Sequence, residues 1–263
     1  MKIVARKPTT THSRELRADS AEWRMRVDLA AAHRLAVMHG FNEGIFNHLT
    51  CSVPGRYDRY LQIPFGLHWC EINASCFLEV SYDARVLRGE GEAERSGFCI
   101  HAPIHRLIPE AVCIMHTHMP FASALARLED PTLLPIGQTE CGLMKDMAYD
   151  EHYTGPAFDP AEGERLARVL GSKRAMLMAN HGVLTVGRSV AEAFDLLFYL
   201  ERAAQVQLYA MWTGRKLKQL PQPIVEQTMR TIGGPMYGGK PHWEHHFAAL
   251  KRMLDRREPD YRD

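Results

Sequence analysis

The chain has 263 residues, of which 46% are hydrophobic and 24% are charged, and its formal net charge is +1. This is the composition of a globular protein, long enough for one large domain or two small ones. Because lysine and arginine are well mixed with aspartate and glutamate, no field of one sign indicates binding to nucleic acid or to a membrane surface.

The first third of the chain predicts a polar arm, one helix and several short strands. Residues 1–18 are polar, and we expect them to form a frayed N-terminal arm. The sequence Asp19-Ser20-Ala21-Glu22 fits a capping box, which predicts a helix that runs to about His39, where Gly40 stops it. Alternating patterns then predict strands at 48–53 and 60–63 and a hairpin made of 77–80 and 84–87.

The middle of the chain predicts two helices on either side of a buried strand. The helices cover 96–108 and 120–128, and the apolar run that forms the strand ends in His116 and His118. Pro120 suits the first position of the second helix, because its missing N–H would have no partner there. The stretch 130–160 is less regular, and we assign no helix or strand to it.

The last third predicts a helix at 161–170, strands at 175–179 and 183–186, and a helix of about seven turns from the capping box at Ser189 to Gly214. Prolines and glycines in 221–235 predict a linker, and a final amphipathic helix begins near Pro241. Irregular alternation of helices and hairpin-like strands favours a mixed or mainly antiparallel sheet covered by helices. We therefore divide the chain into an arm (1–18), one main domain (19–214) and a C-terminal extension (215–263).

The six cysteines and the start of the chain indicate a cytoplasmic location. The cysteines are scattered and no pair has Cys-x-x-Cys spacing, which argues against a zinc ribbon or a disulfide framework. The first residues lack the apolar stretch of a signal peptide, and no run approaches the roughly 18 apolar residues of a membrane-spanning helix.

Three histidines that follow predicted strands are candidates for metal ligands. Alternation places His116 and His118 on the same face at the end of one strand. A pair with this spacing also fits two surface histidines, but His181 lies in a similar setting far downstream. Neutral imidazole is the commonest ligand for zinc and iron, and three protein ligands leave positions open for catalysis. We predict one divalent transition metal per subunit, either zinc, iron(II) or manganese.

The other histidines give weaker evidence for a functional site, and common nucleotide-binding and hydrolase motifs are absent from the sequence. His101 and His105 share a face of a predicted helix, either as a packed pair or with one of them lining the site. The three histidines of the last helix (His242, His245 and His246) lie among charged residues, and we expect a solvated helix face there. The sequence contains no P-loop, no dinucleotide-binding fingerprint and no Gly-x-Ser-x-Gly elbow.

Four separated motifs, taken in order, resemble those of the class II aldolase/adducin family. They are Asn47-His48-x-Thr50, Gly97-Phe98-x-Ile100-His101, His116-x-His118 and Asn180-His181-Gly182. The resemblance implies a three-layer α/β/α sandwich with a mixed, largely antiparallel central sheet, and a homotetramer with active sites between subunits. It also implies that His116, His118 and His181 bind zinc or a similar divalent ion.

The chain departs from the sugar-phosphate aldolases of this family at the acid/base position. Those enzymes have an acidic residue four positions before the residue that matches His101, and here that position is Gly97. Glycine can neither transfer a proton nor bind the metal. We expect one of four residues to replace the missing acid: Glu94, His101, His152 or Tyr153.

The phosphate-binding positions of the family also differ. They correspond to Asn47, His48, Phe65, Arg95 and Ser96. A bulky Phe65 in place of a hydroxyl favours a substrate that is flatter, more apolar and not phosphorylated. We assign substrate binding to Asn47, His48, Phe65, Ser96 and Gln138.

Three functions remain open from the sequence. The first is a metal-dependent lyase that cleaves a C–C bond next to a carbonyl or carboxylate, by retro-aldol cleavage or decarboxylation, in a small, non-phosphorylated hydroxy or keto acid, either aromatic or aliphatic. The second is an iron(II) oxygenase that cleaves with O2, because the strings 42–50 and 116–120 resemble the aldolase-like oxygenases of aminocoumarin biosynthesis. The third is an adducin-like assembly protein, which the three retained histidines disfavour. We place the lyase slightly ahead of the oxygenase.

Overall fold

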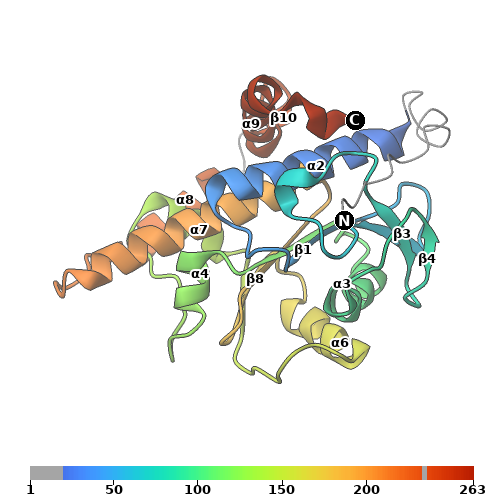
Figure 1. Cartoon of the computed structure of the whole chain (residues 1–263). Helices are drawn as coiled ribbons and strands as arrows, with labels where there is room; N and C mark the ends of the chain where they lie inside the picture. The colour runs from blue at the N-terminus through green and yellow to red at the C-terminus, as the bar shows by residue number, and fades with distance from the viewer. Residues whose placement is uncertain (1–19, 233–235) are drawn as a thin grey trace, which may run out of the picture.

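The computed structural model describes residues 20–232 and 236–263, so the predicted arm at 1–18 lies outside the described residues. One mixed sheet forms the middle layer, and helices cover both of its faces (Figure 1). The helices α2 (Ala21–His39) and α7 (Val190–Trp212) cover one face, and α3 (Arg95–Leu107) and α6 (Pro160–Leu170) cover the other. The predicted three-layer α/β/α sandwich is confirmed.

The sheet has eight strands in the order β4-β3-β2-β1-β5-β8-β7-β6. Only β6 and β7 are parallel; every other neighbouring pair in this sheet is antiparallel. The bounds are β1 His48–Ser52, β2 Arg59–Gln62, β3 Leu78–Ser81, β4 Val86–Arg88, β5 Cys113–Thr117, β6 Met147–Asp150, β7 Ala175–Met178 and β8 Val183–Gly187. The central strand β5 therefore lies between β1 and β8, with His48 opposite His116 and Thr117 opposite Val183.

Smaller elements complete the chain. They are η1 Trp69–Glu71, α4 Pro120–Leu125, α5 Gln138–Met144, α8 Gln222–Ile232, β9 Met236–Tyr237, β10 Lys240–Pro241, α9 His242–Arg257 and η2 Pro259–Arg262. Ser189 caps its helix as the predicted capping box requires, whereas α2 is capped by Ser20, one residue after Asp19, which begins the predicted box and lies outside the described residues. The Ser20 side chain accepts a hydrogen bond from the Trp23 N–H, and the Ser189 side chain accepts one from the Glu192 N–H. Gly40 ends α2 with a φ of 71°, a backbone conformation that glycine adopts without strain.

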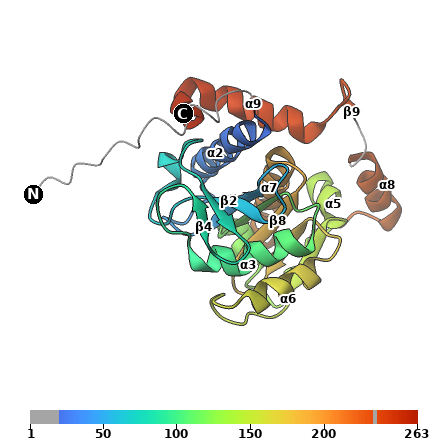
Figure 2. The same cartoon turned by 90° about the vertical axis from the view of Figure 1, so that its right-hand side faces the viewer.

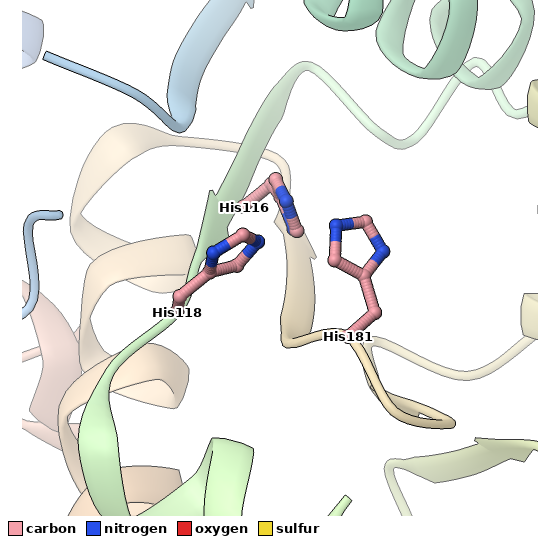
Figure 3. Close-up of side chains that lie close together, drawn as sticks. All are labelled: His116, His118 and His181. Atoms are coloured by element: carbon pink, nitrogen blue, oxygen red, sulfur yellow. The ribbon is translucent and has the colours of Figure 1, made fainter. Parts of the chain in front are cut away.

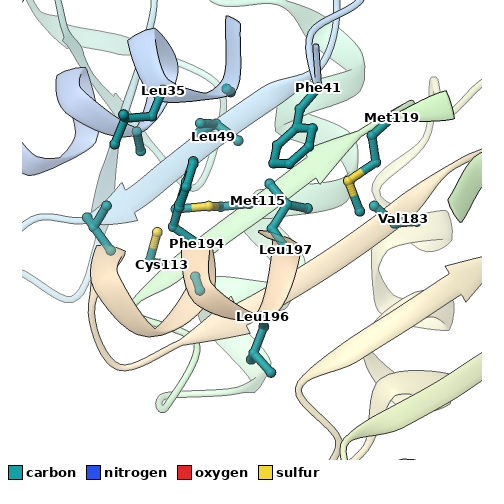
Figure 4. Close-up of a cluster of buried hydrophobic side chains, with 14 of the residues drawn as sticks. Leu35, Phe41, Leu49, Cys113, Met115, Met119, Val183, Phe194, Leu196 and Leu197 are labelled. Atoms are coloured by element: carbon teal, nitrogen blue, oxygen red, sulfur yellow. The ribbon is translucent and has the colours of Figure 1, made fainter. Parts of the chain in front are cut away.

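Two hydrophobic cores lie on opposite faces of the sheet. Leu35, Phe194 and Leu197 pack on Met115 in the larger core (Figure 4). Ile114, the neighbour of Met115, points into the smaller core with residues of α3 and α6. Because side chains alternate along a strand, His116 lies on the same face as Ile114. The end of β5 thus presents His116 on the side of the sheet that α3 and α6 cover.

The C-terminal segment packs against the main domain. The helix α9 lies beside α2, on the side of the sheet opposite α3 and α6 (Figures 1 and 2). Phe247 and Leu254 of α9 are buried in the larger core. The boundary that we drew at 214/215 stays a prediction. Over the described residues, no helix combines the length and apolar character needed to cross a membrane.

The structure corrects two segments of the secondary-structure prediction. The stretch 130–160 contains α5 and β6, and the described part of the expected linker, 221–232, contains α8, whereas 233–235 lie outside the described residues. β6 is stabilised by its parallel pairing with β7, which is distant in sequence and leaves no local signal. Pro221 and Pro223 lie at the start of α8, where missing N–H groups are tolerated, so these prolines begin a helix and do not mark a linker. The helix predicted at 120–128 ends earlier, at Leu125.

Candidate metal centre

Three histidines converge where β5 ends beside the β7–β8 turn. His116 is the fourth residue of β5, His118 follows the strand, and His181 lies in the turn. One potential ligand atom from each lies within 4.8 Å of those of the other two. The ring centroids are 4.8 to 5.0 Å apart, and Figure 3 shows the three rings turned toward one another. The antiparallel pairing of β5 with β8 brings these distant residues together.

The turn that carries His181 requires its two flanking residues. Asn180 has a φ of 53°, in the left-handed region that asparagine tolerates better than most residues. A Cβ atom on Gly182 would lie 2.5 Å from the Thr117 carbonyl oxygen and 2.6 Å from the His118 ring. Only glycine fits that space. The Asn-His-Gly motif is therefore explained by close approach of the turn to the end of β5.

Burial favours the neutral form of two histidines of the cluster, His116 and His181. It lowers the pKa of His116 well below its ordinary value, and the neighbouring His181 and His118 lower it further. Burial, followed by the nearby His118, lowers the pKa of His181 to about 4. Both imidazoles are therefore unprotonated at neutral pH, the form in which histidine binds a metal.

Contacts at Nδ1 leave Nε2 as the nitrogen of His116 and of His118 that is available to the cluster. His116 Nδ1 lies 2.9 Å from the Val183 carbonyl oxygen, which can only accept, so Nδ1 carries the proton and Nε2 keeps its lone pair. His118 Nε2 is buried and has no hydrogen-bond partner among the described residues. A buried nitrogen without a partner is costly unless something binds it. The donor set of three histidine nitrogens therefore fits a divalent transition metal.

His152 and Tyr153, two of the predicted proton-transfer residues, lie at the edge of the cluster. They line a small pocket together with His181, and the Tyr153 ring centroid is 5.9 Å from that of His181. Both side chains are exposed. Arg165 forms a bidentate ion pair with the buried Asp150 and so fixes the start of the loop that carries His152 and Tyr153. The structure therefore brings these two residues near a predicted ligand, with access to solvent.

Glu94 is held as a carboxylate. It caps α3 by accepting hydrogen bonds from the Gly97 N–H (2.8 Å) and the Ser96 hydroxyl (2.6 Å), and it lies 2.8 Å from His48 Nε2. Burial alone would raise the pKa of Glu94, but the bonds from His48, Ser96 and Gly97 together lower it to about 2. At neutral pH this group cannot donate a proton, so its position suits holding His48 and not general acid catalysis.

His48 fills the space beside Gly97. A Cβ atom on Gly97 would lie 2.8 Å from His48 Cδ2 and 2.9 Å from Gln62 Nε2. The His48 ring also lies nearly parallel to that of His116, with centroids 6.4 Å apart. The absence of a side chain at position 97 is therefore coupled to an imidazole that occupies its place next to a predicted ligand.

The remaining predicted residues lie in different surroundings. His101 is fully buried and shares the Thr50 hydroxyl with His105, so it has no surface open to a substrate. Gln138 lines a separate groove of about 580 Å³ between α5, α7 and α9, and the structure does not bring it to the cluster. Asn47 accepts a hydrogen bond from the His118 N–H, and Phe65 is 46% exposed beside Phe46.

Two features were missed or mispredicted from the sequence. Glu43 contacts His118 Nδ1 at 2.5 Å, a contact with no local signal because it joins two loops 75 residues apart. The expected solvated face of α9 is wrong for His242 and His246. Both contact the buried carboxylate of Asp195, at 3.0 and 2.7 Å. That contact depends on how α9 packs against α7, which the sequence of α9 alone does not reveal.

Comparisons with known families, proteins and structures all indicate the same family. Residues 27–208 match the family described as Class II Aldolase and Adducin N-terminal domain. A crystal structure of an aldolase II superfamily protein from Pseudomonas syringae is 35% identical, covers 95% of this chain and 100% of its own, and has a TM-score of 0.87. The L-fuculose 1-phosphate aldolase from Glaciozyma antarctica PI12 is 26% identical, covers 98% of this chain and 97% of its own, and has a TM-score of 0.80. The decarboxylase NovR from Streptomyces niveus is 28% identical over 236 residues, 88% of this chain and 87% of that protein.

Proposed function

The chain belongs to the class II aldolase and adducin family, as its motifs predicted, and from that premise we propose that it is a metal-dependent lyase. The proposed reaction cleaves a C–C bond next to a carbonyl or carboxylate of a small, non-phosphorylated hydroxy or keto acid. The observation that carries the proposal is the convergence of three imidazoles, one of them with a buried Nε2 that has no partner in the described part of the chain.

His116, His118 and His181 would hold the ion, which is zinc, iron(II) or manganese. When bound, a divalent ion with open positions supplies Lewis-acid stabilisation of the negative charge that bond cleavage leaves on the substrate. The protein supplies the orientation of the rings. The Val183 carbonyl fixes His116, and the loop residues Glu43 and Asn47 fix His118.

Proton delivery is assigned to the exposed rim of the site. His152 and Tyr153 lie beside His181 and can reach a substrate from the solvent side. We assign Glu94 the task of holding His48, because its low pKa keeps it ionised. Decarboxylation needs only a late protonation, so it suits a site without an acid at position 97 better than aldol cleavage does. A relative named as a decarboxylase supports the same choice.

The surroundings favour an aromatic or apolar substrate. Phe46 and Phe65 are 55% and 46% exposed, and their ring centroids are 6.3 Å apart. Phe46 belongs to the loop that holds His118, so this pair lies on the same side of the molecule as the cluster. Arg95, at a phosphate-binding position of the family, donates a hydrogen bond to the Phe158 carbonyl oxygen. An arginine engaged in this way does not favour a phosphorylated substrate.

We also propose that the protein works as a homotetramer in the cytoplasm. Val206, Tyr209 and Trp212 expose 46%, 47% and 71% of their surface near the end of α7. Large apolar side chains grouped in this way are typical of a subunit interface. All six cysteines carry free thiols, which supports a reducing compartment.

The test is anaerobic purification followed by metal analysis and turnover of keto and hydroxy acids with and without O2. A lyase gives one metal per chain and product without O2. Product that forms only when O2 is consumed would overturn the lyase in favour of the iron oxygenase. His116→Ala should abolish metal binding and turnover, whereas the exposed His245→Ala should change neither. A protein that binds no metal would leave the adducin-like assembly role.

A further inference from the structure

The loop before β1 holds His118 at two points. The Glu43 carboxylate contacts the ring at Nδ1 (2.5 Å), and the Asn47 side-chain oxygen accepts a hydrogen bond from the backbone N–H (3.2 Å). One loop therefore fixes both the side chain and the backbone of a residue that lies 75 and 71 positions away.

The backbone of this loop is shaped for the contact. Gly44 and Asn47 have φ values of 57° and 74°, and the Phe46 N–H donates to the Glu43 carbonyl oxygen. Glycine and asparagine are the residues that adopt this conformation most readily, so the turn is built for two left-handed positions. The turn places Glu43 at a defined point over the end of β5, although its side chain is 60% exposed.

The contact determines the chemical form of His118. A carboxylate oxygen can only accept, so Nδ1 carries a proton and Nε2 is the nitrogen left to bind a metal. That Nε2 is the buried nitrogen without a partner among the described residues, on the side of the other two histidines. His116 has a neutral carbonyl in the corresponding position. His118 is thus the ring of the cluster that the structure pairs with a negative charge.

We infer that Glu43 is a positioning residue for the metal, because it fixes the tautomer of His118 and strengthens its Nε2 as a ligand. Carboxylates that accept from the far nitrogen of a metal-binding histidine act in this way. The inference rests on the metal site proposed above. The competing interpretation is an ordinary exposed ion pair, which would contribute little to stability and nothing to metal affinity.

The experiment compares Glu43→Ala and Glu43→Gln with Glu110→Gln, which removes a charge from an exposed residue outside the site. The affinity for Zn2+ and Co2+ is measured at pH 7 by competition with a chromogenic chelator. We expect Glu43→Ala to bind about 10–100-fold more weakly than the wild type. The affinity of Glu43→Gln should lie between those of the wild type and Glu43→Ala, because its amide oxygen still accepts the hydrogen bond. Glu110→Gln should match the wild type.

A second readout needs no metal. Long-range 1H–15N NMR of the metal-free protein reports the tautomer of His118, which should be Nδ1–H in the wild type and should shift toward Nε2–H in Glu43→Ala. Thermal unfolding of the metal-free variants should be nearly unchanged, since Glu43 is exposed, and this excludes a folding defect as the cause.

The two proposals fail in different ways. If the wild type and Glu43→Ala bind metal equally tightly, the inference is overturned and the metal site stands. If the wild type binds no metal, the proposed function fails and, with it, the role of Glu43 toward a metal. The NMR measurement then judges the Glu43–His118 contact by itself. An unchanged tautomer in Glu43→Ala would also overturn the inference, whatever the affinities.

Discussion

The coupling between Gly97 and His48 can be tested by adding a single methyl group. In Gly97→Ala the new Cβ would lie 2.8 Å from His48 Cδ2, 2.9 Å from His48 Cγ and 2.9 Å from Gln62 Nε2. None of these contacts is tolerable, so the His48 ring must move. Overpacking of this kind costs about 1–3 kcal/mol. Alanine gains up to about 1 kcal/mol over glycine within a helix, so we expect a net loss of roughly 1–2 kcal/mol of unfolding free energy.

A double-mutant cycle separates this mechanism from a general intolerance of alanine. In a His48→Ala background both ring contacts are gone and only the flexible end of the Gln62 side chain has to shift, so the same Gly97→Ala change should be close to neutral, or stabilising by up to about 1 kcal/mol. Urea denaturation of the four proteins gives the coupling free energy, which we expect to be about 1–3 kcal/mol. An equal loss in both backgrounds would refute the idea that His48 occupies the place of a side chain at position 97.

Three further predictions concern the ligands, the pH dependence and the helix that follows β5. His118→Ala should lower the stoichiometry of bound Zn2+ from one per chain to near zero in equilibrium dialysis, whereas His245→Ala should leave it at one. The pKa of Glu94 falls from its ordinary value of 4.5 to about 2 in the folded protein, so its contribution to stability is present above pH 4.5 and is lost as the pH falls toward 2. Glu94→Gln should therefore be less stable than the wild type at pH 7, on the order of 2 kcal/mol after screening, and the difference should disappear near pH 2 in urea titrations. Glu201 is buried and accepts hydrogen bonds from the N–H groups of Phe121 and Ala122 at the start of α4. Glu201→Ala should therefore lower the unfolding free energy by about 1–3 kcal/mol. A smaller effect than that of the exposed control Glu110→Ala would contradict this.

The parts of the fold that were predictable are those with local causes. Gly40 and Ser189 mark helix ends through bonds to their own neighbours, as predicted, and Ser20 caps α2 one residue after the first residue of the predicted capping box. β6 depends on a partner strand far along the chain, and the prolines before α8 carry the same local signal whether they begin a helix or interrupt one. Local sequence therefore predicts what local hydrogen bonds determine, and it misses elements that tertiary pairing determines.

The same distinction applies to the candidate site. Strand alternation aims His116 and His118 at one point, and the Asn-His-Gly turn supplies a third histidine, so the cluster itself could be proposed from sequence. Glu43 could not, because its contact with His118 depends on where the loop before β1 lies relative to β5. The contacts of Asp195 with His242 and His246 were not predicted either, because they depend on how α9 packs against α7. Residues that hold functional groups in place are harder to predict than the groups themselves.

The register between β1 and β5 links these observations. Because His48 lies opposite His116, the start of β1 and the end of β5 meet at the same edge of the cluster. The loop that enters β1 can therefore reach His118 with Glu43, and the first residue of β1 can fill the space at Gly97 and bind Glu94.

Two carboxylates thus each contact an imidazole at this edge: Glu43 contacts His118, a member of the cluster, and Glu94 contacts His48, whose ring stacks 6.4 Å from that of His116. No carboxylate belongs to the cluster itself among the described residues. A set of neutral ligands leaves the full charge of a divalent ion available to a substrate, whereas a carboxylate ligand would neutralise part of it. The ionised Glu94 cannot serve as an acid, and the remaining candidates, His152 and Tyr153, lie at the exposed rim. Release of CO2 from the substrate, followed by protonation of the product from His152 or Tyr153, needs no acid within the cluster. For this reason we place decarboxylation ahead of aldol cleavage.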